Sequence, residues 1–304
     1  MHKDYYILIS DYIKYLEMEK KYSSDTIRAY SIDLNQFFSY FDNYISISKM
    51  KIDDIQRFIQ YLSYNKLSER TIYRKIASIK SLFEYLSRYE IIKINIAKLI
   101  KGPKLPKRLP TYLSIDEVLK LFSYPYGDSF VDLRDSLILE LFYATGIRIS
   151  ELVKIKICDV QLEGGKLKVL GKGSRQRMVL FGQSATNILR KYIVKRSAYN
   201  RYKQCTYLFP QQRKDRNGMY LSHIHTRTVY NIVKKYISKI SADEKLSPHS
   251  LRHTFATHLL NNGADLMSVK ELLGHSDLSS TQIYTHVNIK ELKKSFLKAH
   301  PHAK

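Results

Sequence analysis

The chain has 304 residues, 44% of them hydrophobic, and a formal net charge of +23, so it is long enough for two domains that each bury a core. Its two cysteines lie outside any CxxC or Cys/His cluster, which excludes a disulfide scaffold, and its charged N-terminal segment is neither a signal peptide nor a membrane span, so we expect a cytoplasmic protein. The net charge is +6 in residues 1–104, +2 in residues 105–110 and +15 in residues 111–304, which indicates a polyanionic partner, most commonly nucleic acid.

Residues 1–100 are expected to form a helical domain without strands, because apolar residues recur there at helical spacing. The predicted helices cover residues 5–20, a segment that Ser23 or Ser24 begins, and residues 52–64, 70–88 and 91–100. Basic side chains gather near one end and flank of the fourth helix, namely Lys66, Arg70, Arg74 and Lys75. They could contact the phosphates of a DNA duplex or form an ordinary solvated helix face.

Residues 101–110, KGPKLPKRLP, are predicted to be an extended linker. Three prolines and one glycine prevent a continuous helix. The positive charge of this segment, including Lys107 and Arg108, suits contact with a DNA backbone.

A second domain is predicted over residues 111–304. It begins with a capping box, Ser114-x-x-Glu117, and continues with a helix over residues 132–143. The Gly146 turn then delivers Arg148, with Glu151 on the next short helix. Alternating patterns predict three short strands over residues 152–157, 166–170 and 176–180, with Lys172 at the tip of the second hairpin.

Further helices are expected over residues 185–201 and 226–239. Between them, residues 208–220 suggest an irregular polar loop. A short amphipathic helix is predicted near the C-terminus, at about residues 289–300.

Residues 247–287 carry the densest set of chemically useful side chains. Ser247 and Pro248 are typical of a helix start, and His249 and Arg252 are three residues apart, so they share a helix face. A second helix follows Gly263, and Gly274 ends it just before His275. Two packed helices could therefore aim three cationic or hydrogen-bonding groups at one phosphodiester, where charge develops on the non-bridging oxygens during transfer.

Arg148, His249-x-x-Arg252, Leu273-Gly274-His275 and Tyr284-Thr285-His286 occur in this order. In this pattern the sequence resembles the tyrosine recombinases, closely the bacterial Xer type, over nearly its whole length. The resemblance implies a mainly α-helical protein with a small antiparallel β-sheet, in which a helical core-binding domain and a catalytic domain form a C-shaped clamp on DNA.

The resemblance also implies the role of each residue. Tyr284 would attack phosphorus to give a 3′-phosphotyrosine and a free 5′-hydroxyl. Arg148, Arg252 and His275 would bind the non-bridging oxygens, His249 would act as general base, and Lys172 would protonate the leaving oxygen. Glu151 would orient this network. No carboxylate cluster with metal-ligand spacing is visible in the sequence, so we expect neither a metal site nor a cofactor.

The partners implied are a double-stranded recombination site and a homo- or hetero-tetramer that exchanges strands through a Holliday junction. Chromosome-dimer resolution at cell division, possibly prompted by a septal DNA translocase, is the role implied by the Xer type. An integrase or excisionase of a mobile element, a non-cleaving DNA-binding protein with this fold and a type IB topoisomerase are the alternatives. Residues 289–300 would dock on a neighbouring subunit, because their apolar side has no obvious partner within one chain.

Overall fold

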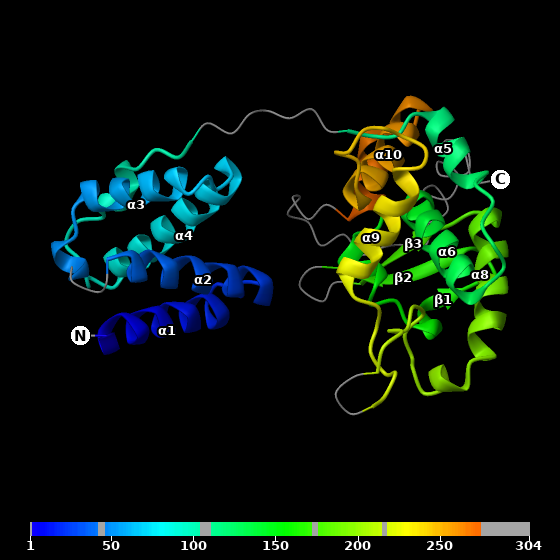
Figure 1. Cartoon of the computed structure of the whole chain (residues 1–304), viewed down its shortest axis with the longest axis horizontal. Coiled ribbons are helices and arrows are strands. Elements are labelled where there is room, and N and C mark those ends of the chain that lie inside the picture. Colours follow the sequence, from blue (N-terminus) through cyan, green and yellow to red (C-terminus); the bar gives the residue numbers. More distant parts are fainter. Residues whose placement is uncertain (1, 42–45, 104–110, 172–175, 215–217, 275–304) are drawn as a thin grey trace. The chain divides into compact units, whose positions relative to one another are not determined.

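The computed structural model describes residues 2–41, 46–103, 111–171, 176–214 and 218–274. The chain divides into two compact units, Met1–Arg108 and Leu109–Lys304. The described part is mainly helical, with one small sheet (Figure 1), as the sequence predicts. The predicted Lys107, Arg108, Lys172, His275, Tyr284 and C-terminal helix lie outside the described residues.

The described part of the N-terminal unit contains four α-helices: α1 (His2–Met18), α2 (Ser24–Tyr40), α3 (Ile52–Tyr64) and α4 (Glu69–Arg88). The hydroxyl of Ser23 accepts a hydrogen bond from the backbone N–H of Thr26 at the start of α2. The hydroxyl of Ser68 accepts one from the backbone N–H of Thr71 at the start of α4. Helix α2 packs against α1 and α4, and α3 packs against α4. Their apolar stripes meet in one core that includes Phe37, Phe58 and Phe83.

The fifth predicted helix is wrong in extent. Residues 91–100 contain only a 3-10 turn, Ile96–Leu99, after a short irregular segment. Ile92, Ala97 and Ile100 are buried, whereas Ile91, Ile94 and Leu99 are exposed, so the apolar residues do not form the single continuous face that a helix would need.

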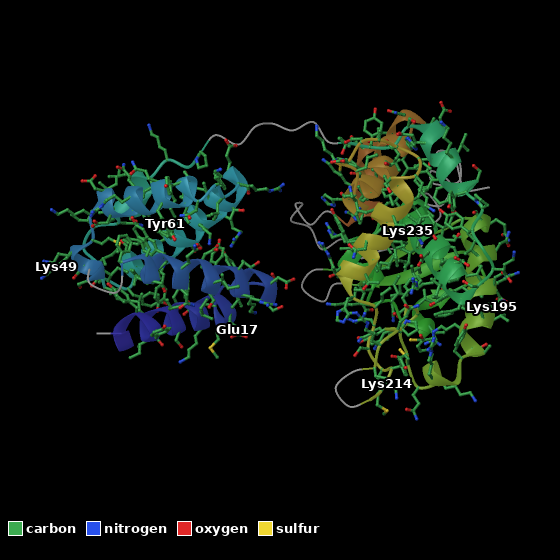
Figure 2. The ribbon with its side chains drawn as sticks, viewed as in Figure 1. Glu17, Lys49, Tyr61, Lys195, Lys214 and Lys235 are labelled. Atoms are coloured by element: carbon green, nitrogen blue, oxygen red, sulfur yellow. The ribbon has the colours of Figure 1, made fainter. Side chains whose placement is uncertain are left out.

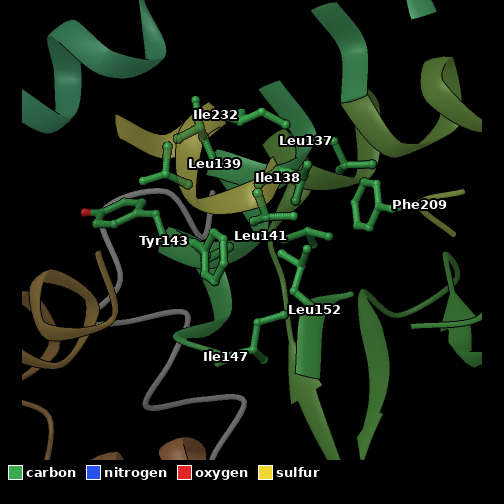
Figure 3. Packing of buried hydrophobic residues seen from close by; sticks show 14 of the residues in the cluster. Leu137, Ile138, Leu139, Leu141, Tyr143, Ile147, Leu152, Phe209 and Ile232 are labelled. Atoms are coloured by element: carbon green, nitrogen blue, oxygen red, sulfur yellow. The ribbon is translucent and has the colours of Figure 1, made fainter. Parts of the chain in front are cut away.

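The C-terminal unit is organised around α6, a helix that is buried on nearly every side. Helix α6 contacts α8, α9, α10 and strand β3. Figure 3 shows its side chains Leu137, Ile138, Leu139 and Leu141 gathered with residues that are distant in sequence, such as Phe209 and Ile232. The helices and strands of this unit are α5 (Ile115–Phe122), α6 (Phe130–Thr145), α7 (Ile149–Leu152), β1 (Val160–Gln161), β2 (Lys166–Leu170), β3 (Gln176–Leu180), α8 (Gln183–Ser197), α9 (Thr226–Ile237), α10 (Pro248–Asn261) and α11 (Leu266–Leu273).

The sheet is antiparallel, in the order β1-β2-β3. The second and third predicted strands match β2 and β3. The first prediction is wrong, because residues 152–157 end α7 and begin a 3-10 turn, and β1 lies further on. The N–H of Leu208 donates to the carbonyl of Ile155 and the N–H of Ile157 donates to Thr206. This segment therefore pairs with residues 206–208, and its alternation reflects burial against the core.

Helices α10 and α11 form a smaller cluster with β3. Phe255 and Leu259 of α10 pack against Val269 and Leu273 of α11 and against Leu180. Leu260 and Leu266, on the same two helices, are exposed. The cluster brings the end of α11 to the end of α6.

Candidate active site

The site begins where α6 ends. Gly146 caps the helix in the left-handed conformation, with φ of 59°, and its N–H donates to the carbonyl of Phe142 at 2.9 Å. Ile147 follows and is fully buried, so its side chain anchors the turn in the core directly before Arg148. The turn fixes the direction in which Arg148 leaves the core.

Glu151 holds Arg148 from one turn further on. The backbone N–H of Arg148 donates to Oε2 of Glu151 at 2.8 Å, and its guanidinium Nη1 donates to Oε1 at 3.2 Å. The side chain of Glu151 is only 2% exposed, whereas that of Arg148 is 37% exposed. A buried carboxylate therefore anchors an arginine that reaches solvent and can meet a ligand.

Arg252 lies in the first half of α10 and is buried. Pro248 occupies the first turn of this helix, and the hydroxyl of Ser250 accepts the N–H of Ser247. The guanidinium of Arg252 donates to the carbonyl of Gly146 and, at 2.7 Å, to the carbonyl of Leu273. One side chain thus joins the ends of α6, α10 and α11.

Burial lowers the pKa of Arg252 to about 10, and the nearby charge of Arg148 adds to this effect. Arg252 therefore remains a cation at neutral pH. Burial acts to raise the pKa of Glu151, but hydrogen bonds from Arg177 and from the Arg148 backbone, with both positive charges, hold it below its ordinary value. Glu151 is thus ionised at neutral pH.

Arg177 is a member of this cluster that the sequence analysis missed. Its Nη1 and Nη2 donate to Oε1 and Oε2 of Glu151 at 2.7 and 2.9 Å. A sequence signal existed, because Arg177 alternates with Val179 on the inward face of β3 and lies opposite the buried Val169. An arginine on the buried face of a strand needs a buried acidic partner.

The remaining predicted residues are placed as follows. His249 is exposed on α10, one turn before Arg252. Gly274 ends α11 with φ of 65°, directly before His275, and Lys172 follows β2 by two residues. Lys172, His275 and Tyr284 themselves lie outside the described residues.

The predicted DNA-contacting residues of the N-terminal unit differ in accessibility. Lys66 and Arg70 are exposed, and Arg74 is exposed while also paired with Asp33. Lys75 is only 4% exposed, and its ammonium donates to Asp33 at 2.8 Å and to Gln36 at 2.5 Å. The prediction that Lys75 contacts DNA is corrected, because its ammonium is bonded to Asp33 and Gln36 inside the domain.

Exposed basic side chains lie on both units. Figure 2 shows Lys49 on the N-terminal unit and Lys195 and Lys235 on the C-terminal one, and all three are exposed. In the described parts of the chain, no three His, Cys, Asp or Glu residues are placed to hold a metal ion. The helices among the described residues are too short or too polar to cross a membrane.

An exposed arginine, a buried arginine and a carboxylate that fixes the first of them make up the described part of the candidate site, and guanidinium groups match the geometry of an oxyanion such as a phosphodiester. Two comparisons define the class of protein. Residues 111–291 match the phage integrase family, and residues 9–90 match the N-terminal SAM-like domain of phage integrases. The chain therefore belongs to the phage integrase family, the tyrosine recombinases, and within it to the Xer type that the following relatives represent.

The tyrosine recombinase XerC of Thermodesulfovibrio yellowstonii is 40% identical over 302 residues, covering 97% of each chain. The tyrosine recombinase XerD of Listeria innocua is 39% identical over 303 residues, covering 97% of this chain and 99% of the relative. Among solved structures, XerH recombinase bound to its palindromic difH substrate aligns with a TM-score of 0.69 and 24% identity, covering 95% of this chain and 84% of that one. The Tn1549 transposon integrase bound to transposon DNA aligns with a TM-score of 0.66 and 18% identity, covering 94% and 98%. These two structures share the fold, and the family matches and the relatives identify the enzyme as a site-specific recombinase.

Proposed function

We propose that this recombinase cuts and rejoins double-stranded DNA at a specific site, with the site residues acting as the family resemblance implies. The observation that carries the proposal is the convergence of Arg148, Glu151 and Arg252 at the ends of α6 and α11. Two guanidinium groups so placed would bind the non-bridging oxygens of a scissile phosphate.

Strand cleavage is a transesterification. The phenol oxygen of Tyr284 attacks phosphorus, His249 accepts its proton, and the bond from phosphorus to the 5′-oxygen breaks. Lys172 donates a proton to that oxygen, and His275 adds a donor to the phosphate. Rejoining is the reverse reaction with the 5′-hydroxyl of a partner strand, so the bond energy is conserved in the phosphotyrosine and neither ATP nor a metal ion enters the balance.

The biological role that we propose is resolution of chromosome dimers at cell division, in the cytoplasm. The names and full-length coverage of the XerC and XerD relatives support it. Strand exchange between two sites would require a tetramer, formed by this chain alone or with a homologous recombinase, and a septal DNA translocase could act as an activating partner. Similar identities to XerC and XerD, 40% and 39%, favour neither position in a two-recombinase pair.

Covalent trapping tests the enzyme and its site together. Purified protein is mixed with randomly nicked genomic DNA from its source, without metal, and SDS-resistant complexes are sequenced. We expect one enriched locus with the wild-type chain and none with Tyr284→Phe, which lacks the attacking hydroxyl. A locus near the replication terminus supports dimer resolution, and one beside the gene supports a mobile-element integrase. An adduct that persists in Tyr284→Phe would show that another residue is the nucleophile.

We also propose that residues 289–300 dock on a neighbouring subunit. Deleting residues 289–304 should reduce assembly of the tetramer on two sites more than binding to a single site. Native gel shifts with one-site and two-site duplexes measure both quantities. Unchanged tetramer assembly would contradict the docking role.

A further inference from the structure

Among the described residues, Arg177 forms a two-point hydrogen bond with the carboxylate that holds Arg148. It reaches both oxygens of Glu151, at 2.7 and 2.9 Å, and its side chain is 8% exposed. Arg148 gives the same carboxylate a single side-chain hydrogen bond at 3.2 Å. The two-point geometry of Arg177 therefore determines where the carboxylate lies.

Arg177 also lies against the turn at the end of α11. A Cβ added at Gly274 would come within 3.0 Å of both Cδ and Nε of Arg177. The Nε atom is buried and has no hydrogen-bond partner among the described residues. The guanidinium of Arg177 thus fills the space next to Gly274, the residue that precedes His275.

We propose that Arg177 is a positioning residue for the recombination reaction: it fixes Glu151 and so aims Arg148 at the scissile phosphate, and it packs against Gly274 at the end of α11. This inference rests on the role proposed above for Arg148. It goes beyond that role because it gives strand β3 a part in the reaction.

The physical reason is competition for one buried carboxylate. With Arg177 in place, both oxygens of Glu151 are already bonded, so the guanidinium of Arg148 gives the carboxylate only one hydrogen bond and its other donors can serve the phosphate. Without Arg177, the buried carboxylate would need a new partner, and the exposed Arg148 already forms an ion pair with it. Arg148 would then turn toward Glu151 and away from the DNA.

The same contact joins the site to the β2–β3 hairpin. Arg177 is the second residue of β3, and β3 is the strand that follows Lys172. The contact with Glu151 anchors the start of β3 beside the arginine cluster, which consists of Arg148, Arg177 and Arg252. A shift of β2 or β3 would therefore change the position of Arg148, because Arg177 and Glu151 connect them.

The test compares Arg177→Met with Arg148→Ala on a nicked duplex that carries the locus recovered by covalent trapping. For Arg177→Met we expect single-turnover cleavage to fall on the order of 10²-fold, the usual cost of misplacing a reacting group by about 1 Å. Site affinity should remain within roughly threefold of wild type, because the side chain of Arg177 is buried and already bonded to Glu151. Arg177→Lys, which keeps the charge but cannot form a fork, should recover part of the rate.

A substrate with a neutral methylphosphonate at the scissile position separates positioning from simple structural damage. This substrate lacks the charge that Arg148 stabilises, so the deficits of both Arg148→Ala and Arg177→Met should shrink on it. The pH profile gives a second readout. Loss of Arg177 lets burial raise the pKa of Glu151, so the acid limb of cleavage should move to higher pH in Arg177→Met.

The proposal is overturned if Arg177→Met cleaves at the wild-type rate, or if its deficit is equal on the two substrates and the pH profile does not move. If Arg177→Met does not fold, judged by thermal unfolding, the same comparison is made with Arg177→Lys, and equal deficits there overturn the proposal too. A normal rate in Arg148→Ala would instead contradict the proposed site itself.

Discussion

Two independent constraints favour glycine over any other residue at position 146. The φ of Gly146 is 59°, a conformation that costs an L-residue about 1–2 kcal/mol. An added Cβ would also lie 2.5 Å from Cδ1 of Phe255 and 2.8 Å from Cδ2 of Leu273, so the smaller cluster would have to move. The carbonyl of Gly146 accepts a hydrogen bond from the guanidinium of Arg252, so a movement of Gly146 would also displace Arg252.

We therefore expect Gly146→Ala to lower the free energy of unfolding by that strain and by about 1–3 kcal/mol of overpacking, and to slow cleavage. Gly263→Ala is the matched control, because Gly263 has φ of 83° but nothing lies within 4 Å of an added Cβ. Gly263→Ala should lower the free energy of unfolding only by the backbone strain, and it should leave the cleavage rate unchanged. Urea unfolding and single-turnover cleavage measure both, and equal losses in the two variants would contradict the overpacking argument.

The residues of the site were predictable to different degrees. Arg148, Glu151 and Arg252 follow turns, caps and spacings that are local in sequence, and the structure brings these three together. Arg177 was missed because its partner is 26 positions away and only the strand register places it on the buried face. The basic residues near α4 look alike in sequence, and only the packing of α2 shows that Lys75 points inward.

At the scale of the element, caps and glycines predicted several helix boundaries. Ser23 and the Ser114–Glu117 box begin helices as expected, since side-chain oxygens there satisfy free N–H groups. The segments that failed, residues 91–100 and 152–157, have apolar residues arranged by burial against a core. Such a pattern does not reveal which backbone partner a segment will find.

Helices α2 and α4 are tied by a buried ion cluster in which Asp33 meets both Arg74 and Lys75. Asp33→Ala should lower the free energy of unfolding of the N-terminal unit by about 3–5 kcal/mol, because it leaves the ammonium of Lys75 buried and unpaired. Adding Lys75→Met should restore part of that loss, since the uncompensated charge is then gone. Hydrogen exchange of the N-terminal helices in the full chain measures each change.

The exposed Lys66 provides the control for this cluster. Lys66→Ala should change stability by no more than about 0.5 kcal/mol, as is usual for surface substitutions. If Asp33→Ala and the double variant with Lys75→Met are equally unstable, the charge of Lys75 is not what the cluster compensates.

At the scale of the whole molecule, the two units share one physical property, their positive charge. The net charge of +23 is spread over both, with +6 in residues 1–104 and +15 in residues 111–304. Binding that uses phosphate contacts from both units releases many counterions, so affinity depends steeply on salt. Chemistry inside the arginine cluster should depend much less on salt, because buried charges are poorly screened.

We expect the affinity for a single site to fall roughly 10³-fold or more between 50 and 200 mM salt, as for a protein with six or more phosphate contacts. Cleavage at saturating DNA should change little over the same range. Lys66→Ala and Arg70→Ala should each reduce the slope of log affinity against log salt by about 1, whereas Lys75→Met should leave it unchanged. Fluorescence anisotropy with a labelled duplex measures the slopes. An unaltered slope in both exposed-residue variants would mean that the N-terminal unit meets DNA through another face, and a reduced slope in Lys75→Met would mean that α4 rearranges on DNA to release its buried lysine.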